Sequence, residues 1–81
     1  MRYVIHYTED DKKTRKTLFD DFLVAYDKDT VLERIVCFTK NHPDYDWERA
    51  TRIMKEVDPN IEDAFVAYDD KKWYWLIIRI M

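Results

Sequence analysis

The sequence contains no glycine. Glycine supplies the positive φ angles that tight turns and phosphate-wrapping loops use, so its absence excludes the glycine-rich nucleotide-binding motifs. The single cysteine, Cys37, has no partner for a disulfide within the chain. Histidine is also scarce, because only His6 and His42 are present. The chain therefore has few of the residues that usually build catalytic and metal sites.

Long apolar stretches are missing as well. The strongly apolar stretch at residues 73–78 is far shorter than the roughly 20 residues that span a bilayer, and residues 1–6 lack the apolar segment of a signal peptide. We therefore expect a cytoplasmic protein without a membrane segment. The formal net charge of −3, from 14 basic and 17 acidic side chains, argues weakly against a domain whose main task is to neutralise phosphate groups.

The residues that are present favour a folded domain. Hydrophobic residues make up 47% of the sequence and aromatic residues 16%, unlike the composition of disordered chains. With 81 residues, the chain is expected to form one compact domain over residues 1–81. A chain of this length buries only about 60 to 65% of its unfolded surface. Most of its strongly apolar residues are therefore expected to serve the core.

The β-branched and aromatic residues at positions 3–7 predict a first strand. Residues 14–27 fit a helix as well as a strand. We favour a strand because residues 22–27 resemble residues 64–69, which form a clearer strand pattern; Asp20 and Asp21 would then mark a bulge or a break. The tetrapeptide Asp-Asp-Lys-Lys occurs at residues 10–13 and again at 69–72. Both copies are typical of four-residue hairpin connections.

Two helices are expected in the middle of the chain. Thr30 and Glu33 form a capping box for the first helix, which Pro43 ends, and Asp46 is a suitable N-cap for the second. A hairpin of residues 64–68 and 73–80 closes the chain. The order ββααββ predicts an α+β fold in two layers, with an antiparallel sheet of about four strands and both helices packed on one face.

The chemically suggestive residues do not form a recognisable site. His6, His42 and Cys37 have no metal-ligand spacing, and Cys37 and His42 are expected on different faces of a helix end. The 17 acidic side chains give no basis for choosing a catalytic pair. We expect a protein that is not an enzyme and that has no cofactor and no metal.

A compact basic cluster, Lys12, Lys13, Arg15 and Lys16, invites comparison with nucleic-acid-binding surfaces. Together with aromatic side chains on a neighbouring sheet face, it suits contact with a phosphate backbone. However, the acidic residues 9–11 precede it directly, and across a hairpin turn the opposite charges are expected to pair. A solvated charged turn is therefore the favoured interpretation.

The last hairpin is the most informative feature, because pairing Tyr68 with Trp73 determines which side chains share a face. We assign one face to the core; it carries Phe65, Ala67, Tyr74, Leu76, Ile78 and Ile80. The other face would be open to water if both helices pack on one side, yet it is too apolar for that. We predict that it binds a partner, through Val66, Tyr68, Trp73, Trp75 and Ile77, with His6 of the first strand. The alternative is that other segments cover this face and make it ordinary core.

The expected function is therefore that of a small non-enzymatic protein-binding or inhibitor protein. The scarcity of glycine and the abundance of lysine, aspartate, isoleucine and tyrosine suit an accessory protein of a phage or mobile element, including an antagonist of a host defence complex. One alternative is a nucleic-acid-binding or regulatory domain that uses residues 12–16 and the exposed aromatics. Another is a homodimeric structural protein whose open faces pack together.

Overall fold

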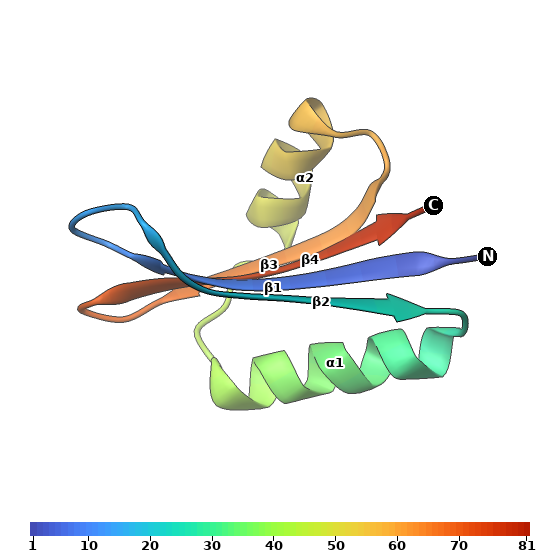
Figure 1. Ribbon diagram of the computed structural model, residues 1–81, viewed down its shortest axis with the longest axis horizontal. Helices are drawn as coiled ribbons and strands as arrows, with labels where there is room; N and C mark the ends of the chain where they lie inside the picture. Colours follow the sequence, from blue (N-terminus) through green and yellow to red (C-terminus); the bar gives the residue numbers. More distant parts are fainter.

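Six secondary structure elements follow one another in the predicted order. The computed structural model describes all 81 residues (Figure 1). The elements are β1 (Tyr3–Asp11), β2 (Thr17–Ala25), α1 (Lys28–Asn41), α2 (Glu48–Val57), β3 (Ile61–Tyr68) and β4 (Lys72–Ile80). The α+β fold and the ββααββ order are thereby confirmed. Neither helix is long and apolar enough to cross a membrane.

The four strands form one antiparallel sheet in the order β2-β1-β4-β3, so the first and last strands of the chain are neighbours at its centre. Tyr68 of β3 pairs with Trp73 of β4, as the sequence predicted. The connection between them forms without glycine because the Asp69 carboxylate accepts bonds from the amides of Lys71 and Lys72, at 2.8 and 2.7 Å. The aspartate at the start of the loop thus takes the role of turn former.

The helices cover opposite faces of the sheet, so the expectation that both pack on one face is wrong (Figure 1). On one face, Val31 and Phe38 of α1 join the larger core cluster with Ile78. On the other face, Ala50 of α2 joins a smaller cluster with Ala64. Both faces of the β3–β4 hairpin are apolar, and each requires a helix to remove it from water. The protein therefore has three layers, with the sheet in the middle.

The connection between the helices carries the chain around the outer edge of β3. Asp46, in this connection, pairs with Val66: the Asp46 amide donates to the Val66 carbonyl at 2.8 Å, and the Val66 amide donates to the Asp46 carbonyl at 3.3 Å. In α2, the Thr51 hydroxyl accepts a bond from the Ala64 amide at 2.9 Å and donates to the Ala64 carbonyl at 3.1 Å. These contacts satisfy backbone groups that an edge strand otherwise exposes.

The strand favoured for the second segment is confirmed, but the predicted bulge or break at Asp20 and Asp21 is wrong. Both residues pair regularly with β1. The irregularity lies closer to the turn, where Glu9 pairs with Phe19 and Leu18 has no partner. The extra residue Leu18, rather than the paired acidic residues, interrupts the ladder, which resumes where Asp10 pairs with Thr17.

The helix starts differ slightly from the predicted ones. Helix α1 begins one turn early, because Asp27 rather than Thr30 is the N-cap and accepts a bond from the Thr30 amide at 2.8 Å. Helix α2 begins at Glu48 with Trp47, rather than the predicted Asp46, at its N-cap. The Asp46 carboxylate, one residue earlier, nevertheless accepts a bond from the Arg49 amide at 3.1 Å. Aspartate is a better cap than threonine, which explains the first difference.

Candidate functional site

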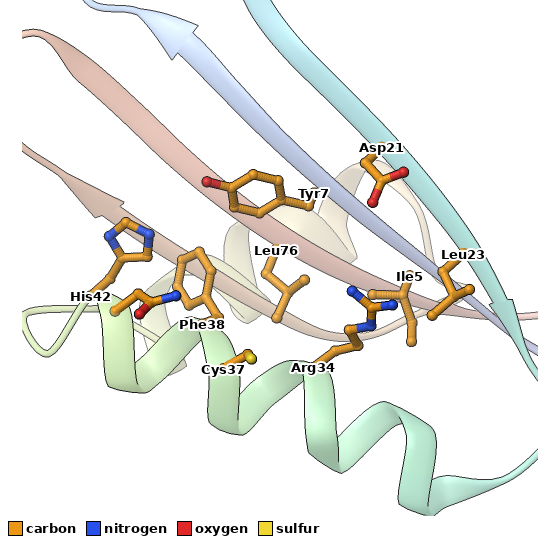
Figure 2. A pocket seen from close by; sticks show the side chains of 10 residues that line it. Ile5, Tyr7, Asp21, Leu23, Arg34, Cys37, Phe38, His42 and Leu76 are labelled. Carbon is orange, nitrogen blue, oxygen red and sulfur yellow. The ribbon is translucent and has the colours of Figure 1, made fainter.

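A cavity of about 150 Å³ lies between α1 and the sheet (Figure 2). Cys37 is exposed, yet it lines this cavity together with His42, although the two were expected on different faces of the helix end. No hydrogen bond joins the two side chains. The His42 ring instead lies against the rings of Phe38 and Tyr74, with centroids 4.8 and 4.3 Å apart. Since no third group orients the histidine, the pair lacks the arrangement of an activated nucleophile.

A network of hydrogen bonds surrounds His42. The Glu9 carboxylate accepts a bond from the Tyr7 hydroxyl at 2.7 Å and one from Lys72 Nζ at 3.0 Å, and the bond from Tyr7 is the main cause of the lowered pKa of Glu9. The Tyr74 hydroxyl donates to Asp69 at 2.6 Å, which lowers the pKa of Asp69 to about 2 and raises that of Tyr74 to about 12. This network joins the strand ends to one another.

Burial lowers the pKa of His42, and the nearby charges of Glu9 and Asp69 only partly oppose this effect. The folded state therefore favours the neutral imidazole, while the unfolded chain binds a proton near pH 6.5. Stability from His42 is present above pH 6.5 and is lost as the pH falls below it.

The substitution His42→Phe keeps an aromatic ring in this position and removes the titration. We expect the wild-type protein to lose more stability than this variant between about pH 7 and pH 5. Urea denaturation of both proteins at several pH values measures the difference. Parallel curves over this range would show that His42 does not titrate differently in the folded state.

No group of three or more histidine, cysteine, aspartate and glutamate side chains is placed to hold a metal ion. The cavity in Figure 2 thus offers a histidine, a thiol and the charged pair Arg34 and Asp21 without a hydrogen bond between any two of them. The surface on the other face of the sheet is the stronger candidate site.

The six residues predicted to bind a partner all belong to the sheet face opposite α1, but α2 covers part of it. Ile77 is only 7% exposed and lies in the core cluster under α2, and Val66 and Trp75 pack partly against that cluster. Tyr68 and Trp73 remain exposed, at 64% and 36%, with ring centroids 5.1 Å apart. We call Tyr68, Trp73 and Trp75 the tryptophan surface.

His6 lies apart from the tryptophan surface, nearer the edge of the sheet. Its ring stacks on Phe22 with centroids 3.9 Å apart, and its Nε2 atom bonds to Asp20. Phe22 is 59% exposed, and Val24 on the same side of β2 is exposed too. Neither was predicted as a surface residue, because the strand order was not predicted. All four residues from Phe22 to Ala25 are apolar, so no polar–apolar alternation marks the exposed pair.

The charges around the tryptophan surface are of both signs. Lys12 Nζ lies 4.6 Å from the Tyr68 ring centroid and 5.4 Å from that of Trp73, and it donates to the Asp69 carbonyl. Arg15 and Asp10 line a depression beside Trp73. The expected pairing of the basic cluster with residues 9–11 is not found, because Glu9 pairs with Lys72, and Lys13, Arg15 and Lys16 form no ion pair.

Comparison with known proteins gives no further guide to this surface. No protein-family model matches the chain, and no curated protein or solved structure is similar enough to count as a match. Proposals about function therefore start from the side chains described above.

Proposed function

We propose that the protein acts without catalysis, by binding a protein partner through the tryptophan surface. The observation that supports this proposal is the joint exposure of Tyr68 and Trp73 on an open part of the sheet face. Solvated strands usually carry polar residues at such positions. Tryptophan and tyrosine are the side chains that most often dominate the binding energy of protein interfaces. An inhibitor that occupies a surface of a larger complex acts in this way.

The charges beside the tryptophan surface favour a protein over a nucleic acid. Asp10 and Asp69 lie next to Arg15 and Lys12, so the rim is mixed in sign. A nucleic-acid groove requires a continuous positive surface along the backbone. A mixed rim instead matches the polar surroundings of protein interfaces.

A nucleic-acid partner is the second candidate, supported by one specific contact. The Lys12 ammonium lies over both the Tyr68 and Trp73 rings, and the unpaired Arg15 lines the same side. Single-strand-binding proteins combine aromatic platforms with such cations. Because phosphate binding releases counterions, its affinity falls steeply with salt, whereas aromatic burial against a protein depends on salt only weakly.

The double variant Tyr68→Ala/Trp73→Ala tests the proposal. We expect it to remain folded, because both residues are exposed, and to retain about tenfold less partner than the wild type when each is immobilised and incubated with a lysate of the producing cell. Trp75 is left unchanged because it packs against the core cluster under α2. Retention is quantified at roughly 0.1 and 0.5 M salt, with and without nuclease.

The matched control is Leu32→Ala/Val36→Ala, which removes two exposed apolar side chains from α1. It should retain the partner as the wild type does. Equal losses in both variants would mean that the tryptophan surface is not the binding site. Retention that disappears with nuclease, or that falls steeply with salt, would establish the nucleic-acid alternative instead.

A further inference from the structure

The two edges of the sheet differ. Thr51 and Asp46 close the outer edge of β3. No segment pairs with the outer edge of β2, and all of its residues except Leu23 and Ala25 are exposed. A long, exposed and partly apolar edge strand is a template for pairing with another strand.

The backbone bonds of β1 show which groups of β2 point outward. The Lys12 amide donates to the Lys71 carbonyl, on the β4 side, and the Asp11 amide donates to the Lys16 carbonyl, on the β2 side. Because hydrogen-bonding direction alternates along a strand, the odd-numbered residues of β1 bond to β2. Their partners between Phe19 and Ala25 of β2 are also the odd-numbered residues. The residues whose amides and carbonyls face outward are therefore Asp20, Phe22 and Val24.

We propose that a second copy of this chain pairs with this edge, antiparallel and centred on Phe22. Residues 19–25 pair with β1 without a bulge, and Phe22 is the middle residue of this stretch. In this register Phe22 lies opposite Phe22 of the second copy, and Asp20 lies opposite Val24. The outward-facing backbone groups of both chains then form about six reciprocal hydrogen bonds.

Other registers of the same pairing are less favourable. Centring the pair on Asp20 or on Asp21 places two carboxylates directly opposite each other, which destabilises a sheet. Centring it beyond Phe22 leaves part of the regular stretch unpaired. Only the Phe22 register uses the whole stretch and pairs an aromatic residue with an aromatic residue.

The charges at the two ends of β2 complement each other in this arrangement. Arg15 and Lys16, which have no ion pair within the chain, precede β2. The start of α1, which follows β2, carries Asp27 at its N-cap and Asp29 in its first turn, with Lys28 between them, and is net negative. Antiparallel pairing places the basic end of one copy near the acidic start of α1 in the other. This self-complementarity favours a second copy as the partner of the edge.

Cysteine cross-linking tests the register. In a Cys37→Ser background, Phe22→Cys should form an intermolecular disulfide under mild oxidation, because directly opposite residues have Cα atoms about 5.5 Å apart. The matched variant Val24→Cys should not, because its two copies lie roughly 14 Å apart. Equal cross-linking of the two variants, or none with Phe22→Cys, would overturn the register.

Sedimentation analysis tests the dimer itself. At roughly 100 μM chain the wild type should contain dimer. The substitution Phe22→Lys should raise the dissociation constant of the dimer by about tenfold or more, since it places two ammonium groups opposite each other. Val36→Lys, on α1, should not, and circular dichroism should show all three proteins folded. A wild type that is monomeric at this concentration overturns the proposal, even if its edge binds an extended peptide of another protein. A dimer that Phe22→Lys leaves intact overturns it as well. Because the tryptophan surface is separate, Tyr68→Ala/Trp73→Ala should dimerise normally.

Discussion

Replacing Ile78 with alanine is expected to lower the free energy of unfolding by about 3 to 4 kcal/mol. Ile78 is 0% exposed and lies in β4 opposite Ile5, in the cluster that α1 covers. The loss combines the transfer of buried methyl groups to water with the cavity left behind. Against a total stability of roughly 5 to 10 kcal/mol for a small domain, this is a large fraction. Urea denaturation at neutral pH measures it.

The matched control for this change is Ile53→Ala. Ile53 is an isoleucine on α2 that is 46% exposed and belongs to neither core cluster. Its replacement should cost about 1 kcal/mol or less, because it removes only part-buried surface outside the core. Similar losses at the two positions would contradict the core assignment.

Thr51→Val is expected to destabilise the protein by about 2 kcal/mol, although valine has nearly the same shape. The Thr51 hydroxyl bonds both the amide and the carbonyl of Ala64, which is fully buried. Valine leaves both groups without a partner and out of contact with water, so the full cost of desolvation appears. Denaturation measures the loss, and faster hydrogen exchange of the Ala64 amide locates it.

Thr39→Val serves as the control for the hydroxyl. Thr39 donates to the Val36 carbonyl within α1, so its loss leaves no strand group unsatisfied and should cost less than about 0.5 kcal/mol. If Thr51→Val were equally mild and left the exchange of Ala64 unchanged, the hydroxyl would not protect the edge of β3.

The features that the sequence predicted correctly are local ones. The register of Tyr68 with Trp73 follows from a loop of fixed length, and strand alternation then separates the two faces of the last hairpin. The stop at Pro43 and the hydrogen bond from the Arg49 amide to Asp46 at the start of α2 likewise depend on neighbouring residues. By contrast, the start of α1 was misplaced because Asp27 and Thr30 both have side chains that cap a helix, and the stronger cap prevailed.

The features that the sequence did not predict are contacts between distant segments. The placement of α2 depends on the pairing of Asp46 with Val66, which carries the chain around the edge of β3 to the opposite face. That placement buries Ile77 and leaves Tyr68 exposed, so it divides the predicted site. Phe22 was missed for a related reason: strand order determines its exposure, and no local pattern encodes that order.

The closed edge of β3 has a consequence for how large an assembly of this chain can become. Strand pairing between sheets propagates without limit when every unit offers two reactive edges, and this is how fibres grow. Here Thr51 and Asp46 occupy backbone groups of β3 and so block strand pairing at that edge. A unit with a single reactive edge joins one other unit and then stops. Association through β2 therefore ends at a closed pair of chains and does not continue into a filament.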